Sequence, residues 1–192
     1  ELGRLGYREA HALQQEVLAA RIARTTPDTL LVVEHDPVFT LGRKRSAKAN
    51  LLDAGDVPVI PVARGGDVTF HGPGQVVVYP IVALEGARQD LHDHLRRLEE
   101  AAIRTCGDFD LVAGRDGRNT GAWVGGRKVC SVGIACRQWV TWHGLALNVD
   151  VDLDYFQRIH PCGLESGLLT SMVAQAGRPL EKTAVQTALV AH

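Results

Sequence analysis

Residues 64–75 read Arg-Gly-Gly-Asp-Val-Thr-Phe-His-Gly-Pro-Gly-Gln and lie between two strand-like runs, Val57–Ala63 and Gln75–Val82. This glycine segment lacks the Lys-Ser/Thr ending of a Walker A loop and the Gly-x-Gly-x-x-Gly spacing of a dinucleotide-binding fold. Its glycines are compatible with a hairpin loop that has several positive φ angles, or with a backbone that a ligand contacts directly. The two glycine clusters that flank Thr69 and His71 contain more glycines than a hairpin requires. The hairpin loop and the ligand-contacting backbone both remain open as interpretations.

The pattern on either side of the glycine segment predicts helices around a sheet. Apolar residues recur at helical spacing within residues 6–24, and Asp90 is a typical N-cap for a second helix. A last helix is expected from Pro179 onward. Further strands are expected in the β-branched and apolar runs Thr29–Glu34, Gly121–Val124, Lys128–Cys136 and His143–Val149. Because helices and strands do not alternate regularly, we expect one α+β domain over residues 1–192, with a mixed, largely antiparallel sheet flanked by helices.

Composition excludes several classes of protein. A net charge of −1 and a pI of about 6.8 give no general attraction to nucleic acid or to an anionic membrane. No apolar run reaches the roughly 18 residues of a membrane span, no signal peptide is recognised, and the cytoplasm is the expected compartment. The four cysteines form no Cys-x-x-Cys pair, which argues against a zinc ribbon, a thioredoxin motif or a disulfide scaffold. The basic cluster Arg43–Lys48 is local, either a solvated loop or a contact for an acidic partner.

Two residues are candidates for catalysis. Cys162 lies in His-Pro-Cys-Gly-Leu, where proline and glycine place it on a turn, and Lys128 stands among small and apolar residues. An unpaired cysteine is more often a small buried hydrophobe, and a lysine at a strand start more often faces solvent. A lysine at the edge of an apolar site can nevertheless act as a base, and an ammonium nearby lowers the pKa of a thiol. Together with the glycine segment, this pair indicates covalent acyl chemistry.

The remaining candidates have weaker patterns. His71 and His143 show no metal-ligand spacing with the cysteines, so no metal site is expected. Each histidine is interpreted as orienting a neighbour or lining a pocket, and His143 is assigned a supporting role. Alternation along a regular strand would place Cys130 on the same face as Lys128, as a second thiol near that lysine. A bulge near Gly133 would remove that relation.

Four motifs in this order resemble those of the lipoyl(octanoyl) transferases. They are Arg-Gly-Gly-x-x-Thr-x-His-x-Pro-Gly-Gln, Lys with Ser-Val-Gly, His-Gly-Leu-Ala-Leu-Asn-Val and Pro-Cys-Gly. Leu31–Arg43 is also similar to the early segment of that family, and the likeness runs from about residue 3 to about residue 172. The resemblance implies the catalytic fold of biotin and lipoate protein ligases and a reaction without a cofactor. It implies octanoyl transfer from acyl carrier protein, through a cysteine thioester, to a lysine of an apo lipoyl domain. The implied acceptors are the lipoyl domains of 2-oxoacid dehydrogenase complexes and the glycine cleavage H protein.

The resemblance also implies roles for individual residues. By motif match, Cys162 carries the acyl group, and Lys128 lowers the pKa of that thiol and exchanges protons. The implied substrate-binding residues fall in three stretches: Arg64, Gly65, Gly66, Asp67, Val68, Thr69, Phe70 and His71; Ser131, Val132 and Gly133; and Gly144, Leu145 and Ala146.

Two other functions remain as alternatives. An ATP-dependent lipoate or biotin ligase on the same fold would activate a free carboxylate as an adenylate and would not need Cys162. A thiol-rich binding or redox-sensing domain would use Cys130, Cys136 and Cys162, but that function leaves residues 64–75 unexplained.

Overall fold

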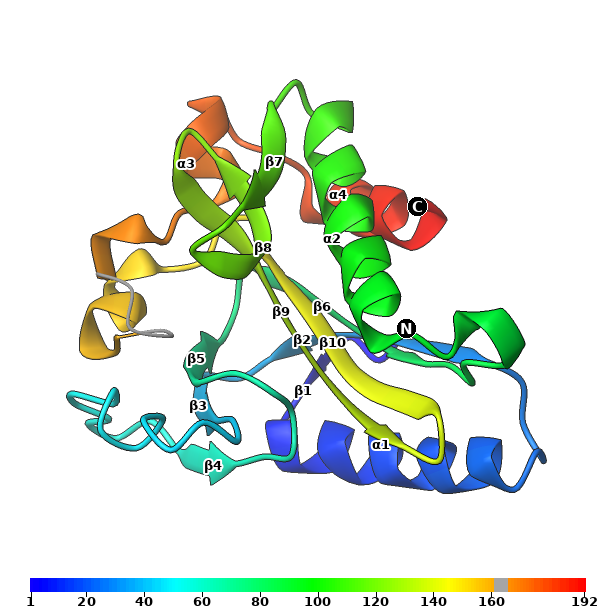
Figure 1. Cartoon of the computed structure of the whole chain (residues 1–192). Helices are drawn as coiled ribbons and strands as arrows, with labels where there is room; N and C mark the ends of the chain where they lie inside the picture. The colour runs from blue at the N-terminus through cyan, green and yellow to red at the C-terminus, as the bar shows by residue number, and fades with distance from the viewer. Residues whose placement is uncertain (161–165) are drawn as a thin grey trace.

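The computed structural model describes residues 1–160 and 166–192, and its centre is a seven-stranded sheet (Figure 1). The strand order is β1-β2-β6-β10-β9-β8-β7. The β1–β2 pair is parallel and the other five pairs are antiparallel, which confirms the expected α+β class and mixed, largely antiparallel sheet. The strands are β1 (Arg4–Leu5), β2 (Thr29–His35), β6 (Gln75–Ile81), β7 (Ala113–Asp116), β8 (Asn119–Val124), β9 (Arg127–Arg137) and β10 (Val140–Asn148).

Helices cover both faces of this sheet. On one face lies α1 (Tyr7–Ile22), and on the other lie α2 (Leu91–Asp108) and α4 (Lys182–Ala191) (Figure 1). The Asp90 carboxylate accepts hydrogen bonds from two backbone N–H groups at the start of α2, as its N-cap pattern predicts. The shorter helical elements are the 3₁₀ turns η1 (Gly86–Arg88), η2 (Leu153–Arg158) and η4 (Ser166–Leu168), and the helix α3 (Met172–Ala176).

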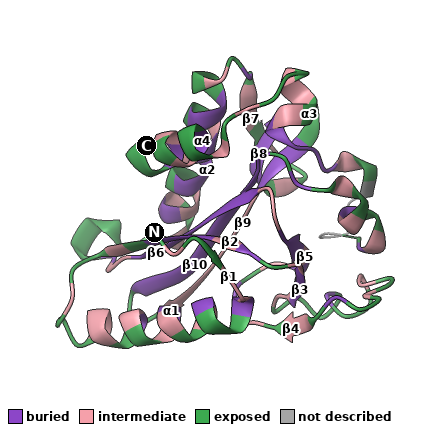
Figure 2. Ribbon diagram, turned by 180° about the vertical axis from the view of Figure 1, so that it is seen from behind, coloured by how far each residue is buried: buried purple, intermediate pink, exposed green. Residues whose placement is uncertain are grey.

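Burial on both faces explains the sequence of the central strands. Every residue of β6 and of β10 is buried, and these strands form the continuous interior seen in Figure 2. One hydrophobic cluster lies between the sheet and α1 and includes Leu18 and Trp142. The other lies between the sheet and the α2–α4 pair and includes Leu98 and Leu189. A strand buried on both faces has a nearly continuous apolar sequence, as Gln75–Val82 does.

A second, three-stranded sheet contains part of the glycine segment. Its order is β4-β3-β5, formed by β3 (Val38–Leu41), β4 (Val59–Pro61) and β5 (Val68–His71). The strands β3 and β5 were not expected, because each has only four residues and glycines flank β5. The strand expected over Val57–Ala63 pairs only at its centre, within β4. Phe39 and Phe70 bury one face of this sheet against η2.

Among the residues that the structure describes, no helix is both long enough and apolar enough to cross a membrane.

Candidate active site

An inner cavity lies between the glycine segment and the strands β9 and β10. Lys128 and Asn119 line it, and Tyr7, Val77 and Tyr79 line it from the main sheet and α1. The remaining wall is formed by Arg64, Gly65, Gly66, Asp67, Val68, Thr69 and His71, by Ser131, Val132 and Gly133, and by His143, Gly144, Leu145 and Ala146. The structure therefore brings all the expected substrate-binding residues except Phe70 around one cavity, together with Lys128 and His143.

Close backbone contact holds the glycine segment against β9. The Gly65 N–H donates to the Ile134 carbonyl oxygen at 2.9 Å. A Cβ atom on Gly133 would lie 3.2 Å from the Gly65 carbonyl oxygen, so a side chain there would press on the segment. Gly66 has a φ of +87°, which glycine adopts without strain. The glycines thus let one backbone lie against another, and the same backbone lines the inner cavity.

Arg64 and Asp67 shape the glycine segment from within. The Arg64 guanidinium, 8% exposed, donates to the Asp67 carbonyl oxygen at 2.9 Å and to the Thr40 side-chain oxygen at 2.8 Å. The Asp67 carboxylate accepts from Ser46 Oγ at 2.7 Å and from Asn50 Nδ2 at 2.9 Å. These contacts fix the segment to β3 and to the loop that follows it.

Phe70 does not lie at the inner cavity, unlike its neighbours in the motif. Its ring is 1% exposed and stacks on Tyr155, with 4.2 Å between ring centroids. Side chains alternate along β5, so Thr69 and His71 reach the cavity while Phe70 enters the core of the small sheet.

Lys128 is a buried side chain and not a surface lysine. It is 5% exposed, and its Nζ donates to Asn119 Oδ1 at 2.5 Å. A Cβ atom on Gly121 would lie 2.7 Å from Lys128 Cε, so only a glycine leaves room for the lysine stem. Asn119 was not expected at the site, because an asparagine after Gly-Arg has the composition of an ordinary turn.

Cys162 lies outside the described residues, but the chain on either side of residues 161–165 is described. Before them, the His160 N–H donates to the Asn50 carbonyl oxygen at 2.7 Å. After them, the Thr170 N–H donates to the Lys128 carbonyl oxygen at 3.0 Å, and Leu169 forms a bridge with Lys128. One flank is thus attached beside the glycine segment, and the other is attached to the lysine.

Cys130 is not the second thiol on the face of Lys128 that strand alternation predicts. Ala122 pairs with Cys130 and Trp123 pairs with Lys128, so Val129 is an extra residue in a bulge. Val129 and Cys130 both enter the core between the sheet and α2. Burial holds the pKa of the Cys130 thiol well above its usual range, and the side chain is 1% exposed. The sequence suggested a possible bulge at Gly133, and the structure places it at Val129.

The inner cavity is lined near α1 by Tyr7, His71, Tyr79 and His143, and the buried His35 contacts Tyr79. His35 Nδ1 donates to the Leu5 carbonyl oxygen at 3.0 Å, so His35 Nε2 accepts from the Tyr79 hydroxyl at 2.7 Å. His143 has a φ of +58°, which places its ring against Trp142, 4.2 Å between centroids. Burial, and then the charge of Arg64, lower the pKa of His143 to about 3. Burial also lowers the pKa of His35, and that of His71 further.

Comparison with known proteins identifies the family of this chain. A family model described as the lipoyl protein ligase A/B catalytic domain matches residues 6–192. The octanoyltransferase of Geobacter metallireducens is 46% identical over 180 residues, which cover 94% of this chain and 84% of that protein. The chain belongs to the octanoyltransferase family. The octanoyltransferase of Gloeobacter violaceus is 50% identical over 165 residues, which cover 85% of this chain and 74% of that protein.

Solved structures show the fold that octanoyltransferases share with ligases. A lipoate-protein ligase A bound with ATP superposes with a TM-score of 0.77 at 15% identity, over 99% of this chain and 81% of that one. A bi-partite lipoate protein ligase of Thermoplasma acidophilum superposes with a TM-score of 0.71 at 15% identity, over 99% of this chain and 80% of that one. The expected biotin and lipoate ligase fold is therefore confirmed.

Acid is expected to destabilise this octanoyltransferase family member through its buried histidines. Below pH 6.5 the unfolded chain takes up protons that the neutral folded histidines do not, so the free energy of unfolding falls as pH falls. For His143 the loss extends from pH 6.5 toward about pH 3, at about 1 kcal/mol per pH unit. Urea unfolding at pH 7, 6 and 5 measures this slope. The variant His143→Asn is expected to reduce the pH dependence of the free energy of unfolding, and asparagine tolerates the positive φ at this position.

The exposed His92 provides the control for this experiment. His92→Asn is expected to leave the pH slope as it is in the unmodified protein. Parallel pH profiles for His143→Asn and the unmodified protein would contradict the account.

Asn119 is expected to be a positioning residue for Lys128. Asn119→Ala removes one hydrogen-bond acceptor of Lys128 Nζ, and we expect kcat for acyl transfer to fall about tenfold, with KM for the lipoyl domain little changed. Steady-state kinetics with varied acceptor check this, and Asn119→Asp, which keeps an acceptor oxygen, should retain more kcat than the alanine variant. A rise in KM alone would assign Asn119 to acceptor binding instead.

Proposed function

We propose that this protein moves an octanoyl group from octanoyl-acyl carrier protein, through a thioester on Cys162, to the acceptor lysine of apo lipoyl domains. The observation that carries the proposal is the position of Lys128, which is buried and lines the same cavity as the family's motif segments. The octanoyltransferases at 46% and 50% identity support the acyl group. The acceptors inferred from the resemblance are lipoyl domains of 2-oxoacid dehydrogenase complexes and the glycine cleavage H protein.

The chemistry needs no nucleotide, because the donor is already a thioester. Attack by the Cys162 sulfur on the donor carbonyl forms an enzyme thioester and breaks the bond to the carrier sulfur. The acceptor lysine amine then attacks the enzyme thioester, which forms the amide and releases the Cys162 sulfur. Two ordinary bimolecular steps thus replace a single encounter of three partners. Each step passes through an oxyanion, which hydrogen-bond donors at the site would stabilise.

We assign Lys128 the proton transfers in both steps. In the first, it takes the proton of the Cys162 thiol and gives it to the departing carrier thiolate, so Lys128 ends neutral. In the second, it takes a proton from the attacking amine and returns it to the Cys162 sulfur. The acceptor amine has an ordinary pKa of about 10.4 and is mostly protonated at neutral pH. It loses one proton to solvent before it attacks, and Lys128 takes the second proton as the amide forms. The hydrogen bond to Asn119 supports this role, because it fixes the position of the Lys128 nitrogen.

The test of this function is transfer without ATP. The protein is mixed with octanoyl-acyl carrier protein and an apo lipoyl domain, and the acceptor is analysed by intact mass and by peptide mapping. We expect one octanoyl group on the acceptor lysine. Modification only when free octanoate and ATP are supplied would favour an ATP-dependent ligase, the alternative on the same fold.

A further inference from the structure

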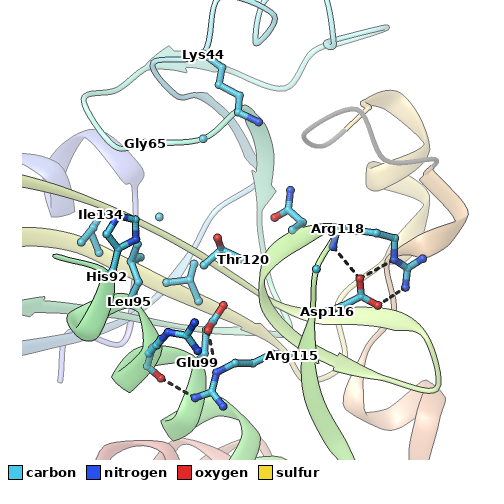
Figure 3. A pocket seen from close by; sticks show the side chains of 16 residues that line it. Lys44, Gly65, His92, Leu95, Glu99, Arg115, Asp116, Arg118, Thr120 and Ile134 are labelled. Atoms are coloured by element: carbon cyan, nitrogen blue, oxygen red, sulfur yellow. Dashed lines mark hydrogen bonds and ion pairs between the residues drawn. The ribbon is translucent and has the colours of Figure 1, made fainter. Parts of the chain in front are cut away.

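A second, wider cavity of about 810 Å³ opens beside the inner one, and we call it the outer groove (Figure 3). Its walls come from α2, from the turn between β7 and β8, and from the loop after β3. Figure 3 shows Lys44 at the top of this space, Glu99 and Arg115 at the bottom, and Asp116 and Arg118 on the right. Five residues line both cavities: Gly65, Gly66, Asn119, Val132 and Gly133. The outer groove therefore adjoins the cavity that holds Lys128.

The outer groove carries an excess of positive charge. Its lining includes four basic side chains and two carboxylates. Arg115 binds Glu99 at 3.0 Å and Arg118 binds Asp116 at 2.7 Å, so each carboxylate is already paired with an arginine. Within the described part of the chain, no carboxylate lies within 4.0 Å of the Lys44 ammonium or the Arg96 guanidinium. These two cations stay available to an anionic ligand, although the whole chain has a net charge of −1.

The backbone fixes Lys44 at the junction of the two cavities. The Lys44 N–H donates to the Gly66 carbonyl oxygen at 3.0 Å, and the Arg43 N–H donates to the Arg64 carbonyl oxygen at 3.1 Å. A Cβ atom on Gly42 would lie 2.4 Å from that Gly66 oxygen, so the two chains are in direct backbone contact. Of the basic residues in Arg43–Lys48, Lys44 alone lines the outer groove in the part of the chain that the structure describes.

We propose that the outer groove binds the phosphopantetheine arm of the acyl donor, with Lys44 and Arg96 as the cations available to its phosphodiester. This inference rests on the proposed function and specifies how the donor is recognised. A carrier-bound thioester sits at the end of a long polar arm, and the phosphate at the other end is its only charge. Lysine and arginine are the side chains that bind phosphate best, by charge-assisted hydrogen bonds. With the phosphate in the outer groove, the five residues that line both cavities lead the arm toward Lys128.

The test compares two donors that differ only in the phosphate, octanoyl-pantetheine and octanoyl-4′-phosphopantetheine. The unmodified protein is expected to favour the phosphorylated donor in kcat/KM. The ratio of the two kcat/KM values is expected to fall about fivefold in Lys44→Ala or Arg96→Ala and about 20-fold in the double variant. Matched controls are Arg45→Ala and Arg97→Ala, which remove an exposed cation one residue further along and do not line the outer groove.

Other outcomes would overturn the inference. A ratio near one in the unmodified protein would do so, as would an equal fall in the control variants. A change confined to KM for the lipoyl domain would assign the outer groove to the acceptor instead. Calorimetry with 4′-phosphopantetheine and with pantetheine measures binding without turnover. In the double variant we expect the affinity for 4′-phosphopantetheine to fall and the affinity for pantetheine to stay as it is in the unmodified protein. Equal binding by both proteins refutes the inference, whereas absence of transfer from every donor refutes the proposed function.

Discussion

Replacing Lys128 by arginine is expected to lower the rate of octanoyl transfer by about 100- to 10,000-fold. Arginine keeps the positive charge but does not release its proton in a protein, so it cannot act as the base for either step. Single-turnover transfer, quenched and followed by intact mass of the acceptor, measures the rate.

An exposed lysine provides the control for the Lys128 prediction. Lys48→Arg makes the same change on the surface and is expected to leave the transfer rate as it is. Thermal unfolding of both variants shows whether the fold is kept. A folded Lys128→Arg protein that transfers octanoyl at a near-normal rate would show that Lys128 is not the base.

Replacing Gly121 by alanine is expected to lower the free energy of unfolding by about 3 kcal/mol. The Cβ atom would lie 2.1 Å from the Cys130 carbonyl oxygen, a backbone atom of the paired strand, and the φ of +141° is unfavourable for alanine. The strands β8 and β9 would have to separate at the bulge beside Lys128. Urea unfolding measures the loss, and the midpoint of thermal unfolding should fall by about 6–12 °C.

Gly114 on the neighbouring strand β7 is the matched position. A Cβ atom there meets no atom within 4 Å, so Gly114→Ala is expected to change stability by less than about 1 kcal/mol. Similar losses in the two variants would mean that backbone contact at Gly121 does not limit the packing of β8 against β9.

The sequence predicted the parts of the fold that have long, regular patterns. The helix within residues 6–24, the Asp90 cap and the strands within Lys128–Cys136 and His143–Val149 all have the expected type. The hairpin between those two strands turns at Gln138 and Trp139, which have positive φ angles of 52° and 59° although neither is glycine. That turn, like the four-residue strand β7, depends on pairing with distant residues and has no local signal.

The candidate site was predictable by motif but not by periodicity. The resemblance selected fourteen of the residues around the inner cavity, because a chain of motifs in fixed order identifies segments that meet in space. Strand alternation failed at Cys130, since the bulge at Val129 arises from the register between β8 and β9. Phe70 was assigned with its motif neighbours although it belongs to the core. Asn119 was missed, because its contact with Lys128 exists only once β8 and β9 pair.

The central claim is that Cys162 carries the octanoyl group. The most direct measurement is the intact mass of the protein after mixing with octanoyl-acyl carrier protein in the absence of ATP, for the unmodified protein and for Cys162→Ser. The account predicts a single octanoyl adduct on the unmodified protein that hydroxylamine removes, and no such adduct on the variant. An adduct of the same yield and lability on Cys162→Ser would contradict it, as would octanoylation of the acceptor only from free octanoate and ATP.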